Sequence, residues 1–206
     1  MENPNTKILN NDRVYAKWNN VYYELTKNKE IDYQIKEVVD FVKEKDNALD
    51  LGAGALVESK FLLEKGFKNV VAVDLYDVRK YTSVEFPEDK NFNYIIQDFE
   101  SFDFKENYYD LIIANNSLTF TTSGELENLL SKIQKSLKQE GVFFGDLFDN
   151  SSSNFREGFS FVDSIEEVKE KLLKSNFKLI DLKKEIGETE IKKQKIISYK
   201  FICKKD

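Results

Sequence analysis

Short apolar runs alternate along the chain with longer segments of helical periodicity. The apolar runs predict buried strands at 48–51, 70–74, 92–96, 109–114 and 142–147. Between them apolar residues recur every three or four positions, most clearly over 124–139, and this spacing predicts crossover helices. Strands that alternate with helices in this way form a parallel sheet with both faces covered.

The two ends of the chain depart from this rhythm. Alternating residues predict strands at 177–184 and 196–203, joined by a polar turn around Gly187, and a hairpin of this kind is antiparallel. Helices are expected over 14–28 and 31–45. The predicted fold class is therefore α/β: a doubly wound, mostly parallel seven-stranded sheet with a C-terminal antiparallel strand. Residues 1–206 should form a single domain, in which 1–45 is a helical segment placed to cover the active site.

Local signals indicate where two of the helices begin and end. Gly66 is expected to end the helix after residue 55 in a left-handed conformation, with Phe67 packing back on its last turn. Asp163 and Glu166 resemble a capping box at the start of the helix that runs to about 173.

Composition narrows the classes of function. The net charge of −6 opposes a phosphate backbone, so nucleic acid is not the expected partner. The sequence has one cysteine, Cys203, which fits core packing and a reducing cytoplasm, and no apolar run long enough to span a membrane. It has no histidine, which excludes a Ser–His or Cys–His nucleophile and a histidine zinc site, and we expect no metal.

The strongest candidate site is the glycine loop that ends the first strand, Gly52-Ala53-Gly54, preceded by Asp50. In doubly wound sheets ligands bind beyond the carboxyl ends of the strands, where the strand order reverses. Asp74 ends the next strand, at the spacing typical of an acid that accepts hydrogen bonds from ribose hydroxyls. The alternative interpretation is a tight turn whose acids merely cap helices. The combination of strand, loop, helix and acid favours a nucleoside site.

Two nucleoside ligands compete for this site. A dinucleotide fingerprint requires a third glycine three positions after Gly54, where the chain has Val57, and the loop lacks the lysine of a phosphate-binding loop. S-adenosylmethionine carries no phosphate and needs neither feature. The sequence therefore favours S-adenosylmethionine over a nicotinamide dinucleotide.

Five successive segments resemble the motifs of class I S-adenosylmethionine-dependent methyltransferases. They are ALDLGAG, VVAVD, IIQDF, YYDLIIANNSL and SLKQEGVFFGD, between about residues 47 and 146. Within that family the chain is similar to small bacterial enzymes of the tellurite-resistance type, which share an early Trp and Tyr, here Trp18 and Tyr22. The resemblance implies a Rossmann-like methyltransferase fold and S-adenosylmethionine as cofactor.

The resemblance also implies roles for individual residues. Those expected to bind the cofactor are Asp50, Gly52, Ala53 and Gly54 at its methionine end, Asp74 at the ribose, Leu75, Asp98 and Phe99 at the adenine, and Asn115 at the methionine moiety. The family often has a third glycine at the position of Leu56, and a Pro-Gly where this chain has Gln139-Glu140. No catalytic base is implied.

The acceptor side of the site is less defined by the sequence. Trp18, Tyr22 and Asn116 are candidates for contacting the acceptor or closing the site. Trp18, Tyr22 and Tyr23 could form an aromatic lid, or they could pack the N-terminal helix onto the sheet, because aromatic residues at helical spacing are common in cores.

The expected activity is methyl transfer to a small-molecule acceptor by in-line displacement, which needs little proton transfer when the acceptor is already nucleophilic. Three alternatives remain. They are a non-catalytic S-adenosylmethionine-binding or partner-regulating domain, a nucleic-acid or protein methyltransferase, and a nicotinamide-dependent oxidoreductase. Neither the acceptor nor the oligomeric state follows from the sequence.

Overall fold

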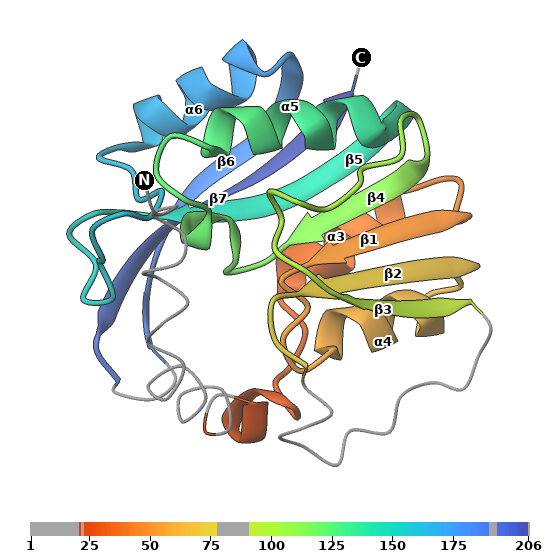
Figure 1. Ribbon diagram of the computed structural model, residues 1–206, viewed down its shortest axis with the longest axis horizontal. Coiled ribbons are helices and arrows are strands. Elements are labelled where there is room, and N and C mark those ends of the chain that lie inside the picture. The colour runs from red at the N-terminus through yellow and green to blue at the C-terminus, as the bar shows by residue number, and fades with distance from the viewer. Residues whose placement is uncertain (1–20, 22, 78–90, 190–192, 206) are drawn as a thin grey trace, which may run out of the picture.

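The computed structural model describes residues 21, 23–77, 91–189 and 193–205, and within them a seven-stranded sheet flanked by helices on both faces (Figure 1). The strands are β1 (Asn47–Leu51), β2 (Asn69–Asp74), β3 (Phe92–Ile96), β4 (Tyr109–Ala114), β5 (Leu137–Phe148), β6 (Phe177–Glu188) and β7 (Lys195–Lys205). The helices are α3 (Tyr33–Phe41), α4 (Val57–Glu64), the short 3₁₀ helix η2 (Leu118–Phe120), α5 (Leu126–Ser136) and α6 (Ile165–Lys174).

The strand order is β3-β2-β1-β4-β5-β7-β6, which confirms the predicted sheet. The first five strands are parallel, whereas β7 is antiparallel to both β5 and β6. The order reverses at β1, since β2 lies on one side of it and β4 on the other. The carboxyl ends of β1, β2 and β4 therefore meet at one edge, which is where ligands bind in such sheets.

Two apolar layers hold the helices on the sheet. α3 and α4 pack on one face through residues such as Ile35, Val38 and Leu62. α5 and α6 pack on the other face through residues such as Leu130 and Leu172 (Figure 1). β1 and β4 are buried along their whole length, as expected for central parallel strands.

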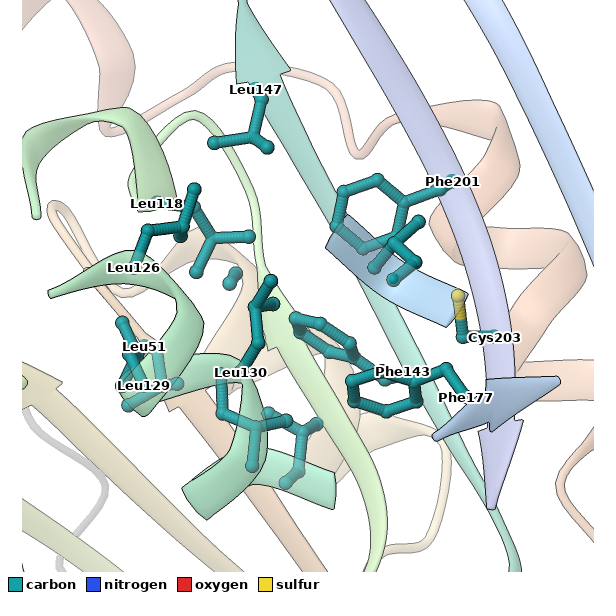
Figure 2. Close-up of a cluster of buried hydrophobic side chains, with 14 of the residues drawn as sticks. Leu51, Leu118, Leu126, Leu129, Leu130, Phe143, Leu147, Phe177, Phe201 and Cys203 are labelled. Atoms are coloured by element: carbon teal, nitrogen blue, oxygen red, sulfur yellow. The ribbon is translucent and has the colours of Figure 1, made fainter. Parts of the chain in front are cut away.

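Figure 2 shows the layer beneath α5 and α6, where aromatic rings from three strands meet. The rings of Phe143 and Phe177 are stacked with their centroids 5.4 Å apart, and the ring of Phe201 lies at the same distance from Phe143. Cys203 is fully buried beside them, and burial raises the pKa of its thiol. This confirms that Cys203 is a core residue.

Several element boundaries differ from the sequence prediction, and α3 spans Tyr33–Phe41 rather than 31–45. α5 ends at Ser136, and β5 begins at Leu137 rather than at 142. Leu137 already pairs with Tyr109, and an irregularity in the ladder accommodates the next residues. Gly187 lies within β6, paired with Ile196, so the turn of the hairpin comes later than predicted.

The caps of two helices test the local signals. Gly66 has a φ of 90°, and the amides of Gly66 and Phe67 donate to the carbonyls of Leu63 and Leu62, as predicted for a helix that ends in a left-handed glycine. The N-cap of α6, however, is Ser164 and not Asp163, with its hydroxyl accepting from the amide of Glu167. The capping residue therefore lies one position after the predicted one.

Candidate functional site

Gly52 has no room for a side chain. Its φ is 77°, and a Cβ added there would lie 2.3 Å from the Cβ of Ser117 and 3.3 Å from the ring of Phe99. Ser117 is itself fixed, because its hydroxyl donates to the carbonyl of Leu51 over 2.7 Å. The close approach of β1 and the segment after β4 therefore requires glycine at this position.

Asp74 holds the glycine loop in place. One of its carboxylate oxygens accepts from the amide of Gly54 over 2.9 Å, and the other accepts from the amide of Tyr76 over 3.1 Å. Burial raises the pKa of this carboxyl, while these amide hydrogen bonds and one from Leu75 act against the rise. The carboxyl remains partly exposed at the end of β2 and retains lone pairs for hydroxyl donors.

Leu56 adopts a left-handed conformation, with a φ of 62°, at the N-cap of α4. This is the position at which the family that the sequence resembles often has a third glycine. The left-handed backbone costs about 1–2 kcal/mol for a non-glycine residue. The fully buried side chain offsets that cost by packing with Tyr23, Ala53, Ala55 and Ala72.

Asp50 lies behind the loop rather than in the cavity in front of it. It is 2% exposed, and its carboxylate accepts a 2.5 Å hydrogen bond from the hydroxyl of Ser59. Burial, with a smaller contribution from the nearby charge of Glu58, raises the pKa of Asp50 to about 8. Asp50 therefore supports the loop and α4 from within, and its predicted contact with cofactor stays a prediction.

The segment after β4 brings two asparagines to the same edge. The side-chain amide of Asn115 donates to Glu58 over 2.9 Å, while the backbone amide of Asn116 donates to Asp146 over 2.5 Å. Asn116 has a φ of 55°, a conformation that asparagine tolerates better than most residues. The side chain of Asp146 is almost fully buried, and burial raises its pKa to about 7.

Of the three residues predicted for the adenine end, Phe99 lies against the glycine loop, and none of the three lines the two cavities at this edge of the sheet. Phe99 is adjacent to Gly52, as the space around that glycine shows. Leu75 is 42% exposed. Asp98 accepts from the amide and hydroxyl of Ser101, and so orders its own turn. Their predicted roles at the adenine stay predictions.

Two adjoining cavities lie at the carboxyl edge of the sheet. The first follows the glycine loop and is lined by Gly52, Ala53, Gly54, Asn115 and Asn116 among the predicted residues, together with Thr26, Lys29, Glu30, Ala55, Val57 and Glu58. The second, with a volume of about 190 Å³, lies between α3 and the β6–β7 hairpin. Lys29, Glu30, Glu58, Asn115 and Asn116 line both, so the two spaces are continuous.

Sequence reasoning missed most of the second cavity. Its walls include Glu185 and Gly187 of β6 and Lys200 of β7, which are far from the glycine loop in sequence. Of the residues that line this cavity, the sequence could have indicated Glu58, because it lies in the first turn of the helix that follows the glycine loop. Trp18 and Tyr22, the proposed lid residues, lie outside the described residues. Tyr23 is 2% exposed and packs on Leu56, which is core packing rather than a lid.

These features define the class of protein. A glycine loop at the point where strand order reverses, an acid ending β2 and an antiparallel β7 form the Rossmann-like fold of S-adenosylmethionine-dependent methyltransferases. Residues 49–145 match the model of a methyltransferase domain family. Over this part of the chain, close to half of its length, the protein is similar to that family, and its fold is that of the class I S-adenosylmethionine-dependent methyltransferases; S-adenosylmethionine is the cofactor that this similarity indicates.

Solved structures share this fold at low sequence identity. The 1,6-didemethyltoxoflavin-N1-methyltransferase of Burkholderia thailandensis is 17% identical with a TM-score of 0.71, and the match covers 100% of this chain and 91% of that one. TehB of Haemophilus influenzae is 16% identical with a TM-score of 0.71, covering 88% and 64% of the two chains. Phosphoethanolamine N-methyltransferase 2 of Haemonchus contortus is 16% identical with a TM-score of 0.63, covering 89% and 56%. No curated protein matches the sequence.

The residues of the first cavity fit this cofactor. The carboxylates of Glu30 and Glu58 suit a positively charged sulfonium and ammonium, and the ammonium of Lys29 suits a carboxylate. The side-chain oxygen of Asn115 is buried without a hydrogen-bond partner among the described residues, so it is available to a donor.

In the same described ranges no helix is long and apolar enough to cross a membrane.

Proposed function

We propose that this protein transfers a methyl group from S-adenosylmethionine to a small-molecule acceptor. The observation that carries the proposal is the continuity of the two cavities, which share several lining residues, Asn115 among them. A ligand on the glycine loop and a second ligand of modest size would lie side by side there. The second cavity, at about 190 Å³, favours a small molecule over a polymer.

The comparisons support a small acceptor without identifying it. The Burkholderia enzyme was solved with 1,6-didemethyltoxoflavin, a small molecule, and S-adenosylhomocysteine bound. The net charge of −6 further disfavours a nucleic acid as acceptor.

Bound S-adenosylmethionine would supply an electrophilic methyl group on a sulfonium sulfur. The chain's own residues would contribute position and charge. Gly52 and Gly54 let the backbone approach the cofactor, Asp74 would accept from the ribose hydroxyls, and Asn115 would stand between the two ligands. Holding the reactants in a near-attack geometry can lower the barrier by up to about 7–11 kcal/mol.

The test is formation of S-adenosylhomocysteine by the purified protein with separate panels of small molecules, transfer RNA, DNA and protein. We expect turnover with members of the small-molecule panel only, and its loss in Asp74→Ala with weaker cofactor binding measured by calorimetry. Turnover with a polymer alone would overturn the small acceptor. Cofactor binding with no turnover in any panel would instead indicate a non-catalytic domain.

A further inference from the structure

The second cavity carries an excess of negative charge. Five carboxylates and two lysines line it, with Ile186 and Ile196 as apolar neighbours. Lys200 forms ion pairs with Asp32 and, over 2.6 Å, with Glu185, so its charge is already balanced. Glu30 and Glu188 take part in no ion pair within the described part of the chain. The electrostatic field of the carboxylates that are not neutralised therefore favours a cation in this cavity.

Two buried acceptor atoms also lack partners among the described residues: Oδ1 of Asn115, which lines the cavity, and Oδ2 of Asp146, which lies behind the lining residue Asn116. The orientation of Asn115 follows from its contact with Glu58, because a carboxylate accepts the hydrogen bond and the amide nitrogen must donate it. Both unpartnered atoms are acceptors, so the group that would complete them is a donor.

Asp146 points to the face of the sheet that forms the cavity. It lies directly opposite Lys200 in the antiparallel β5–β7 ladder, and such partners project from the same face. Lys200 lines the cavity, as does Asn116, whose amide donates to the other oxygen of Asp146. Asp146 is 1% exposed and does not itself line the cavity, so it acts on the cavity through its charge, from behind Asn116 and Lys200.

We propose that the second cavity binds the methyl acceptor as an alkylammonium, that is, that the acceptor of this enzyme is a small amine. The proposal rests on the methyl transfer put forward above. Glu58 lies where the two cavities join, and Asp146 lies behind Asn116, which donates to it, and opposite Lys200 in the β5–β7 ladder. An ammonium provides up to three donors for these acidic and acceptor groups.

The chemistry balances with an amine. A carboxylate of the cavity, Glu58 being the one nearest both ligands, accepts a proton from the ammonium and leaves a lone pair on nitrogen. That pair forms the new bond from nitrogen to the methyl carbon while the bond from carbon to sulfur breaks and its electrons stay on sulfur. The products are a methylated amine and S-adenosylhomocysteine. No oxidant, reductant or further reactant is needed.

The test follows binding and needs no turnover. Protein saturated with S-adenosylhomocysteine is titrated at neutral pH with n-butylamine, 1-butanol and butyrate, which have equal chain lengths. Binding is read from the amide NMR shifts of Asn115, Asn116 and Gly187. We expect n-butylammonium to bind at least about tenfold more tightly than 1-butanol, as a charged hydrogen bond would provide, and butyrate more weakly than either.

Glu58→Gln removes one charge, and Asp146→Asn removes the partial charge of a carboxyl whose pKa is about 7, while both keep an oxygen acceptor for Asn115 and Asn116. Each should weaken n-butylammonium several-fold and leave 1-butanol unchanged, while Glu170→Gln, exposed on α6, should change neither. Equal affinity for n-butylammonium and 1-butanol in the wild-type protein would overturn the amine, even if a variant fails to fold. That result, together with methylation of a neutral small molecule, would leave the proposed function standing.

Discussion

Left-handed backbone occurs at three residues after β1, and two of these, Gly52 and Leu56, differ in what they tolerate. Gly52 is positive in φ and sterically closed, because Ser117 fills the space where its Cβ would lie. Leu56 is also positive in φ, yet its side chain is accommodated and fully buried. At the scale of single residues, the loop therefore depends on glycine at the first position and on apolar packing at the second.

Gly52→Ala should destabilise the protein by about 2–5 kcal/mol, because overpacking against Ser117 adds to left-handed strain. It should also weaken binding of S-adenosylhomocysteine, since the loop must move. Urea denaturation and calorimetry measure the two effects. The matched control is Gly66→Ala, whose φ is also positive but whose Cβ would meet nothing within 4 Å. Equal losses in both variants would contradict the steric argument.

Asp50 gives a dependence of stability on pH. Its folded pKa of about 8 exceeds the ordinary 3.8, so the native state holds a proton that the unfolded chain releases. The contribution of this group to stability therefore falls as pH rises from about 4 to 8. Asp50→Asn retains an acceptor for Ser59 and should gain stability relative to wild type over that window, by a few kcal/mol at most.

Denaturation of both proteins at several pH values checks this prediction. The exposed Asp40→Asn on α3 separates the loss of a surface charge from the loss of a buried one. A constant difference between Asp50→Asn and wild type from pH 4 to 8 would show that Asp50 is not protonated in the native state.

At the scale of elements, the site depends on where helices begin. Asp32 is the N-cap of α3, where its carboxylate accepts from the amide of Gln34, and it also pairs with Lys200 on β7. One side chain thus caps the beginning of a helix and joins it to a strand 168 residues away. α6 begins in the same local way, with Ser164 as its cap, but without such a distant contact in the described residues.

Ser164→Ala should destabilise the protein by about 1 kcal/mol, because the amide of Glu167 loses its acceptor at the N-terminus of α6. Urea denaturation measures this loss. Ser153→Ala, at an exposed loop position, is the control and should be close to neutral. The two variants should share the same m-value, and a loss confined to the control would show that the cap is not formed.

At the scale of the whole molecule, binding of the cofactor at the carboxyl edge of the sheet should stabilise the folded state. A ligand that binds only the native protein stabilises it by about 2.7 kcal/mol at a hundred times its Kd. For a chain of 206 residues this corresponds to a rise in Tm of about 5–10 °C. S-adenosylhomocysteine should produce this rise, and NAD should not.

Thermal unfolding at increasing concentrations of each ligand measures the effect. The rise with S-adenosylhomocysteine should be smaller in Asp74→Ala, which removes the carboxylate that accepts from Gly54. A rise with NAD alone would contradict the assignment of the cofactor.

The sequence determined the strands, the helices that alternate with them and the glycine loop, because these depend on local periodicity and on short spacings. The run from Ala48 to Gly54 and the acid at Asp74 are within one strand–helix–strand unit, so their proximity followed from the chain itself. Boundaries set by pairing between strands, such as the start of β5 at Leu137, did not follow, because the partner Tyr109 lies in another element.

Only the tertiary structure decided how the acids divide between the inside of the protein and its cavities. Asp50 and Asp146 both stand beside loops at the strand ends, yet each is buried, while Glu58 faces the space where the two cavities join. The second cavity itself forms where β6 and β7 come to lie beside α3. Such contacts join residues far apart in the chain, and their burial and charge arise only when the sheet has assembled.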